Sequence, residues 1–239
     1  MILAGLSRNI ILPDHIRQLP DMPFRLRACG SLPRVPLLGV VGSRRPSSCA
    51  LASLPWMVKG AISAGWGIIS GGARGIDAAA HRECLRLCGC TAVVLGSGLS
   101  QCYPPEHAGL FRAIVASGGC LLSEYEDDAP PRPWRFPRRN RLISALCRAL
   151  VVVQAAEKSG SLSTARIASE QHGKTVMAIP GATGSADWVG SNRLLRDGAL
   201  LVTDQEDLEV CLGMLQPSAE TNAEHNEGHR SPGEDHFAL

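Results

Sequence analysis

The sequence contains few aromatic residues and no long apolar segment. Aromatic side chains make up 4% of the 239 residues, whereas hydrophobic residues make up 45%, which predicts a sizeable core of Val, Ile, Leu and Ala. No apolar run approaches the roughly 20 residues that a membrane-spanning helix requires. The segment 1–6 lacks the basic region and the long apolar stretch of a secretory signal. We therefore expect a cytoplasmic protein with no membrane partner.

Disulfide and metal-binding patterns are also missing. The nine cysteines are odd in number and show no framework spacing. Cys84, Cys88 and Cys90 lie close together, but no histidine or second cysteine pair completes a zinc pattern. The acidic stretch 124–128 could bind a metal, although a solvated turn is the more ordinary interpretation. We expect reduced cysteines, no metal and no cofactor.

The net charge of +2 conceals a strong asymmetry. From Asp204 to the end of the sequence there are nine acidic residues and one basic residue, whereas the rest of the chain carries a net charge of +10. A basic body predicts a polyanionic partner. The acidic tail could compete for the same surface, or it could be solvated without a role, which is the simpler interpretation.

Short β-branched runs alternate with helical stretches, which is typical of a parallel sheet covered by helices on both faces. The sequence predicts strands over residues 37–41, 67–70, 91–95, 120–122, 150–154, 176–179 and 200–203. It predicts helices around residues 54–64, 76–87, 106–116, 139–146, 163–171, 192–197 and 207–215.

This pattern divides the chain into three parts. Residues 1–36 are rich in Pro and Arg and are interpreted as a lead-in segment. Residues 37–215 are predicted to form one α/β domain, an extended Rossmann-like fold with a mostly parallel sheet. Residues 216–239 are polar and acidic, and their few apolar side chains cannot offset the entropy of folding, so we expect a disordered acidic tail.

Two glycine-containing loops follow predicted strands. In the first, Gly42 permits a tight turn, and Ser43 and Arg44 could contact a phosphate. The second, at 70–77, has the sequence Ser-Gly-Gly-Ala-Arg-Gly-Ile-Asp, in which the paired glycines expose backbone amides and an arginine supplies charge. Asp77 could brace that loop from the first turn of the following helix. Glycine at a strand–helix junction is a weak signal, and the added arginine makes it moderately specific.

A third stretch, residues 130–141, contains five arginines, two aromatic residues and no acid. Guanidinium groups bind phosphates and flat rings stack on bases, so this composition suits single-stranded nucleic acid. In the competing interpretation, Trp134 and Phe136 anchor a solvated loop to the core. Without a compensating acid, however, the five arginines would repel one another unless an anion binds.

A fourth stretch, residues 158–164, places hydroxyls and a glycine before a predicted helix. Such residues cap helices and can also bind phosphate. Evidence for catalysis is thin. His81 and His107 lie in or near predicted helices without an evident nucleophile, and neither a P-loop lysine motif nor a dinucleotide-binding glycine motif is present.

In this order, the motifs resemble those of the DNA-processing protein A family (DprA/Smf). The resemblance extends from about Leu12 to Leu208 and corresponds to the Rossmann-like core of the family. The matching segments include Ser-Gly-Gly-Ala-Arg-Gly-Ile-Asp-Ala-Ala-Ala-His at 70–81, Pro-Arg-Pro-Trp-Arg-Phe-Pro-Arg-Arg-Asn-Arg at 131–141 and Asn-Arg-Leu-Leu-Arg-Asp-Gly-Ala at 192–199, and their fixed order is more specific than any one of them.

This resemblance implies a homodimer that binds incoming single-stranded DNA during natural transformation or recombination and loads the RecA recombinase. It implies no enzymatic activity. The DNA would lie in a basic pocket whose expected lining is Ser43, Arg44, Gly71, Gly72, Arg74, Arg138, Asn140, Arg141, Ser159 and Gly160.

Two alternatives remain open. Cytokinin-activating phosphoribohydrolases use a related fold and a Pro-Gly-Gly-x-Gly-Thr-x-x-Glu motif, but Ile167 stands where their catalytic glutamate would be needed. A hydrocarbon side chain cannot perform general acid–base catalysis. The second alternative is a sensor that binds a small nucleotide at the same anion sites without turnover.

Overall fold

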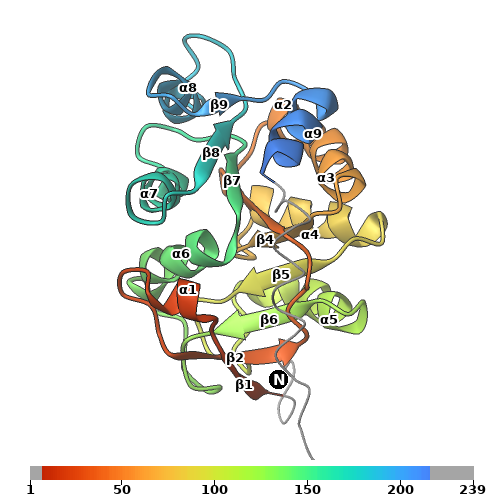
Figure 1. The fold of residues 1–239 in the computed structure, drawn as a ribbon, viewed down its shortest axis with the longest axis vertical. Coiled ribbons are helices and arrows are strands. Elements are labelled where there is room, and N and C mark those ends of the chain that lie inside the picture. The colour runs from red at the N-terminus through yellow and green to blue at the C-terminus, as the bar shows by residue number, and fades with distance from the viewer. Residues whose placement is uncertain (1–6, 216–239) are drawn as a thin grey trace, which may run out of the picture.

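The computed structural model describes residues 7–215, which form a single nine-stranded sheet in the order β1-β2-β6-β5-β4-β3-β7-β8-β9 (Figure 1). Along this order, every neighbouring pair from β6 through β5, β4, β3, β7 and β8 to β9 is parallel. At the other edge, β2 pairs antiparallel with both β1 and β6. The strands are β1 (Arg8–Ile11), β2 (Arg25–Gly30), β3 (Leu37–Val41), β4 (Gly67–Ser70), β5 (Thr91–Val94), β6 (Cys120–Ser123), β7 (Ala149–Val152), β8 (Thr175–Ala178) and β9 (Leu200–Leu201).

Helices cover both faces of the sheet, which confirms the predicted fold class. On one face (left in Figure 1) lie α1 (Asp14–Arg17), α6 (Arg135–Leu146), α7 (Gly160–Arg166), the π-helical segment η2 (Ile167–Gln171) and α8 (Val189–Arg196). On the other lie α2 (Ser48–Ala52), α3 (Leu54–Ser63), α4 (Ile76–Arg86), the short η1 (Pro105–His107), α5 (Ala108–Ala116) and α9 (Gln205–Met214).

The central strands are buried on both faces, as parallel strands covered by two helical layers must be. Alternate residues of each strand enter opposite cores. Leu38 and Val40 of β3 pack with α3 and α4, whereas Leu37 and Val41 pack with the core that includes α6. This two-sided burial is why the strands were visible in the sequence as apolar runs.

All seven predicted strands are present, and three helices begin three or more residues before the predicted position. Helix α6 begins at Arg135 rather than near residue 139, and α7 begins at Gly160 rather than residue 163. Helix α8 begins at Val189 rather than residue 192. Pro137 lies in the first turn of α6, where a proline is tolerated because the backbone amide there has no partner within the helix.

No strand was predicted before Leu37, and this expectation was wrong. Within the lead-in segment 1–36, strands β1 and β2 belong to the same sheet, and β2 pairs with β6. The residues of β2, Arg-Leu-Arg-Ala-Cys-Gly, begin with alternating exposed and buried side chains, as in a strand with one buried face. The predicted acidic tail, residues 216–239, lies outside the described residues.

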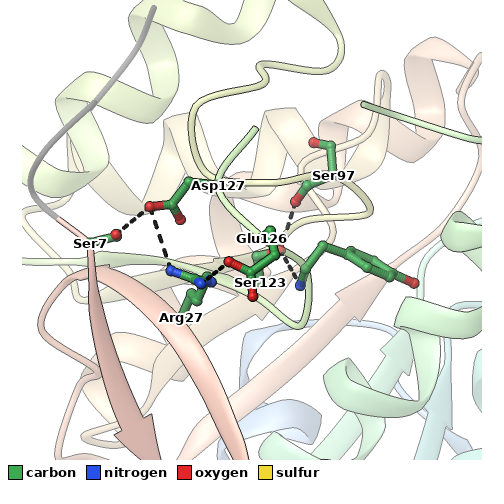
Figure 2. Close-up of polar contacts among 7 residues, drawn as sticks. Ser7, Arg27, Ser97, Ser123, Glu126 and Asp127 are labelled. Carbon is green, nitrogen blue, oxygen red and sulfur yellow. Dashed lines mark hydrogen bonds and ion pairs between the residues drawn. The ribbon is translucent and has the colours of Figure 1, made fainter. Parts of the chain in front are cut away.

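The loop after β6 is tied to the N-terminal strands by polar contacts (Figure 2). Arg27 of β2 pairs with Glu126 and lies 3.7 Å from Asp127, and the Ser7 hydroxyl donates a hydrogen bond to Asp127. The Ser123 hydroxyl donates to the Ser97 carbonyl at 2.7 Å. The acidic stretch 124–128 is therefore largely engaged by arginines, and residues 7–215 contain no cluster of three side chains that could hold a metal ion.

Candidate functional site

The order of the strands reverses beside β3, because β4 follows on one side and β7 lies on the other. Open α/β sheets bind ligands at such a switch point, beyond the carboxyl ends of the strands. A cavity of about 490 Å³ lies there. It is lined by Val41, Gly42, Arg44, Ala73, Asp77, Phe136, Pro137, Arg139, Asn140, Ile143, Ser159, Gly160, Ser161, Ser163 and Thr164.

A smaller hollow of about 30 Å³ adjoins this cavity and shares four of its lining residues, Arg44, Ala73, Phe136 and Arg139. Its remaining lining comes from the loops after β4 and β5, namely Gly71, Arg74, Gly96, Tyr103 and Pro104. The two hollows therefore form one continuous concave surface, with Phe136 and Arg139 between them.

Six of the ten predicted site residues line this surface. Arg44, Asn140, Ser159 and Gly160 face the larger cavity, and Gly71 and Arg74 join Arg44 at the smaller one. Segments from four different loops thus converge, as their positions after parallel strands predicted.

The other four do not line either hollow: Ser43, Gly72, Arg138 and Arg141. The Ser43 hydroxyl instead accepts a hydrogen bond from the Arg45 amide at 3.1 Å. Gly72 has a φ of +65°, and a Cβ there would run into Phe111, so this glycine serves the turn and the core.

Arg141 is a buried residue with carboxylate partners. Its guanidinium pairs with Glu124 and lies 3.0 Å from Asp21, and its side chain is only 7% exposed. Arg138 is nearly half exposed and lies 3.6 and 3.7 Å from the same two acids. The arginine-rich stretch 130–141 is therefore partly compensated by acids from distant segments, contrary to the argument that only a bound anion could relieve its repulsion.

The exposed arginines differ in their partners. Arg44 is exposed at the mouth of both hollows and forms no ion pair within residues 7–215. Arg74 is half exposed and pairs with Glu106 of η1. A phosphate can therefore approach Arg44 without displacing a carboxylate, whereas it must compete with Glu106 for Arg74.

Arg139 lines both hollows but was not among the predicted site residues. It is fully buried against the loop after β4 and donates hydrogen bonds to the carbonyl oxygens of Gly71 and Val94. Burial lowers its pKa to about 10, so it remains a cation at neutral pH. A Cβ at Gly71 would collide with this guanidinium, which explains the glycine there.

Asp77 braces the same loop, as predicted. Its carboxylate accepts hydrogen bonds from the amides of Gly71 at 3.1 Å and Ala73 at 3.3 Å. Burial raises the pKa of Asp77, while attraction to Arg139 opposes that rise. His107 Nδ1 lies 2.9 Å from the Gly72 carbonyl oxygen. Three buried polar side chains therefore fix the backbone of this loop in place.

Helix α7 supplies a wall of hydroxyls to the larger cavity. Ser159 caps the helix by accepting a hydrogen bond from the Ser161 amide, so its ordinary capping role is confirmed. The second wall of the cavity is the start of α6, whose first turn carries arginines and no acidic residue. Positive charge at a helix N-terminus opposes the helix dipole. Both walls favour a negatively charged ligand.

Together, the fold and this surface define a Rossmann-like α/β protein with an arginine-lined concave surface at the switch point of its sheet. The family model for DNA recombination-mediator protein A matches residues 7–213, and the chain belongs to that family.

Individual relatives agree with this assignment. The chain is 43% identical over 198 residues to protein Smf of Escherichia coli, an alignment that covers 82% of this chain and 53% of the relative. The structure of DNA processing protein A from Streptococcus pneumoniae has a TM-score of 0.79 and 34% identity, covering 86% of this chain and 74% of that one.

A structure of DNA processing protein A from Helicobacter pylori, which concerns its mode of binding single-stranded DNA, has a TM-score of 0.77 and 29% identity. It covers 86% of this chain and 95% of the other. This chain spans about half the length of the Smf proteins of E. coli and Synechocystis that it matches.

Proposed function

We propose that this chain binds single-stranded DNA across the two hollows at the switch point. The observation that carries the proposal is Arg44, an exposed cation without an acidic partner in the described chain, beside Phe136 on a concave surface. Arginines bind the phosphates of single strands, and aromatic rings stack on their bases. The Helicobacter relative, which is known for single-stranded DNA binding, supports the same ligand class.

The DNA-binding residues we propose are the six predicted residues that line the surface, together with Phe136. Arg139 is buried and is proposed to hold the loop after β4 in place. Arg138 remains in the proposal as a rim residue, since it is nearly half exposed on the same helix. Arg141 is proposed to hold α6 in position and not to contact DNA, because it is buried between two acids.

We further propose that the bound strand is delivered to the RecA recombinase during transformation or recombination in the cytoplasm. The family assignment supports this role. No helix within residues 7–215 has the length and apolar character needed to span a membrane.

We propose that the chain has no catalytic activity. Ile167, which occupies the position of the glutamate in the phosphoribohydrolase motif, begins η2 and offers no acid–base group. A cavity of about 490 Å³ could also accommodate a small nucleotide, so the sensor alternative is tested in the same experiment. A sensor would bind a mononucleotide and leave oligonucleotides unbound.

The proposed test is a titration of labelled single-stranded oligonucleotide at several salt concentrations. Three arginines, Arg44, Arg74 and Arg138, are accessible, and each phosphate contact contributes about −0.7 to the slope of log affinity against log salt. We expect a slope of about −2, so that affinity falls roughly 20-fold from about 50 to about 200 mM salt. Replacing Arg44 by Ala should weaken binding and flatten the slope by about 0.7.

Arg34 is the matched control, because it is an exposed arginine that lines neither hollow. Arg34→Ala should leave both affinity and slope unchanged. If Arg44→Ala binds DNA with the wild-type slope while remaining folded, the proposed interface is in the wrong place.

A homodimer is also proposed, through the β9 edge of the sheet. Leu200 and Leu201 are 44% and 54% exposed on this two-residue strand, and Val210 and Met214 of α9 are exposed as well. Leu208 of the same helix is fully buried in the core and is not part of this apolar surface. We expect light scattering to give a dimer mass for the wild type and a monomer mass for Leu201→Glu. A wild-type monomer at micromolar concentration would refute this proposal.

A further inference from the structure

Two aromatic side chains meet at the smaller hollow. The rings of Tyr103 and Phe136 have centroids 5.0 Å apart and are tilted by 40°. Phe136 lines both hollows, whereas Tyr103 lines only the smaller one and is 38% exposed. Tyr103 therefore extends the aromatic surface away from the switch point, towards the loop after β5.

The Tyr103 side chain lies beside a cation. Tyr103 and Arg74 line the same hollow and interact electrostatically, and the Arg74 guanidinium also pairs with Glu106. A ring that could stack on a base and a guanidinium that could bind a phosphate thus lie side by side. A single nucleotide carries both a base and a phosphate, so it could contact both side chains at once.

The size of the smaller hollow decides how a nucleotide could use it. A volume of about 30 Å³ is comparable with the share of one water molecule in the liquid, so a base cannot enter. A base could only lie on the exposed side of Tyr103, at the rim.

We infer that Tyr103 and Arg74 form a further nucleotide subsite, in which the Tyr103 ring stacks on one base while Arg74 takes the adjoining phosphate. This subsite rests on the proposed single-stranded DNA binding and extends it beyond the larger cavity. In it, Arg74 exchanges Glu106 for the phosphate, and the Tyr103 ring contributes affinity that does not depend on charge.

Trp134 provides a matched control. Like Tyr103, Trp134 is an exposed aromatic residue, with an exposed fraction of 53%. It belongs to the arginine-rich stretch 130–141 but lines neither hollow. Its ring makes an edge contact with Tyr125, and Arg135 lies 5.3 Å from its centre.

The experiment compares two single strands of equal length, one with bases and one with abasic sites on the same sugar–phosphate backbone. Affinities are measured for the wild-type protein and for Tyr103→Leu, Tyr103→Phe and Trp134→Leu. Leucine keeps an apolar contact with Phe136 but removes the ring. Phenylalanine keeps the ring but removes the hydroxyl that interacts with Arg74, so the two variants separate stacking from the positioning of Arg74. Circular dichroism verifies that each variant is folded.

Stacking contributes about 1–3 kcal/mol per base, so Tyr103→Leu should reduce the preference for the base-containing strand by about 5- to 150-fold. The salt slope should not change, and Tyr103→Phe and Trp134→Leu should keep the wild-type preference. If Tyr103→Leu retains that preference, or weakens both strands equally, the subsite is refuted while DNA binding stands. If the wild-type protein binds neither strand, the proposed function itself fails.

Discussion

Replacing Arg139 by methionine should lower the free energy of unfolding by about 3–5 kcal/mol, a loss comparable with that of removing one charge from a buried ion pair. The change leaves the Asp77 carboxylate buried without its nearby cation and the carbonyl oxygens of Gly71 and Val94 without their donor. Because burial already raises the pKa of Asp77, loss of the cation should raise it further. Urea denaturation measures the effect.

Two further variants sharpen this result. Asp77→Asn combined with Arg139→Met removes both charges and should recover part of the lost stability, because a pair can be replaced at less cost than it can be broken. Arg138→Met, one residue away but nearly half exposed, should change stability by less than about 1 kcal/mol. Equal stability of the Arg139 and Arg138 variants would contradict the buried position of Arg139.

Arg141→Glu should also cause a folding defect, of about 3–5 kcal/mol, instead of the simple DNA-binding defect that the sequence suggested. The new carboxylate would be buried against Glu124 and next to Asp21, so that like charges replace two ion pairs. For a chain of this size the melting temperature should fall by roughly 6–20 °C. Differential scanning calorimetry measures this change.

Arg138→Glu is the matched variant for DNA binding. Arg138 faces the same two acids at 3.6 and 3.7 Å but is nearly half exposed, so its ion pairs contribute little to stability. This variant should remain folded and bind single-stranded DNA more weakly. Wild-type melting of Arg141→Glu would show that its guanidinium is not held as described.

The parallel part of the fold could be predicted because its strands are apolar on both sides. Runs such as Leu37–Val41 therefore stand out between amphipathic helices. Strands β1 and β2 did not stand out, since strands with one solvated side carry arginines that resemble a loop. The pairing of β2 with β6 depends on residues about 90 positions away, which no local pattern reveals.

The loops of the site could be predicted from their positions after strands, but the orientation of individual arginines could not. That orientation depends on where α6 begins. Once the helix starts at Arg135, Phe136, Arg139, Asn140 and Ile143 fall at helical spacing on one face, and all four line the cavity. Treating Pro137 as a loop residue concealed this pattern. The acids that engage Arg141 come from two other segments and leave no signal within the arginine-rich stretch.

The antiparallel edge of the sheet also sets an order of events during synthesis. Strands β1 and β2 are made early and can pair with each other, but β2 cannot join the rest of the sheet until its other partner, β6, follows at least 90 residues later. Closing so long a loop costs entropy before any contact is gained, so these strands should join the sheet late. Asp21, which precedes β2, can reach Arg141 only after α6 has been made. The basic start of α6 would therefore acquire its final orientation late in folding, when the earliest part of the chain docks against one of its later helices.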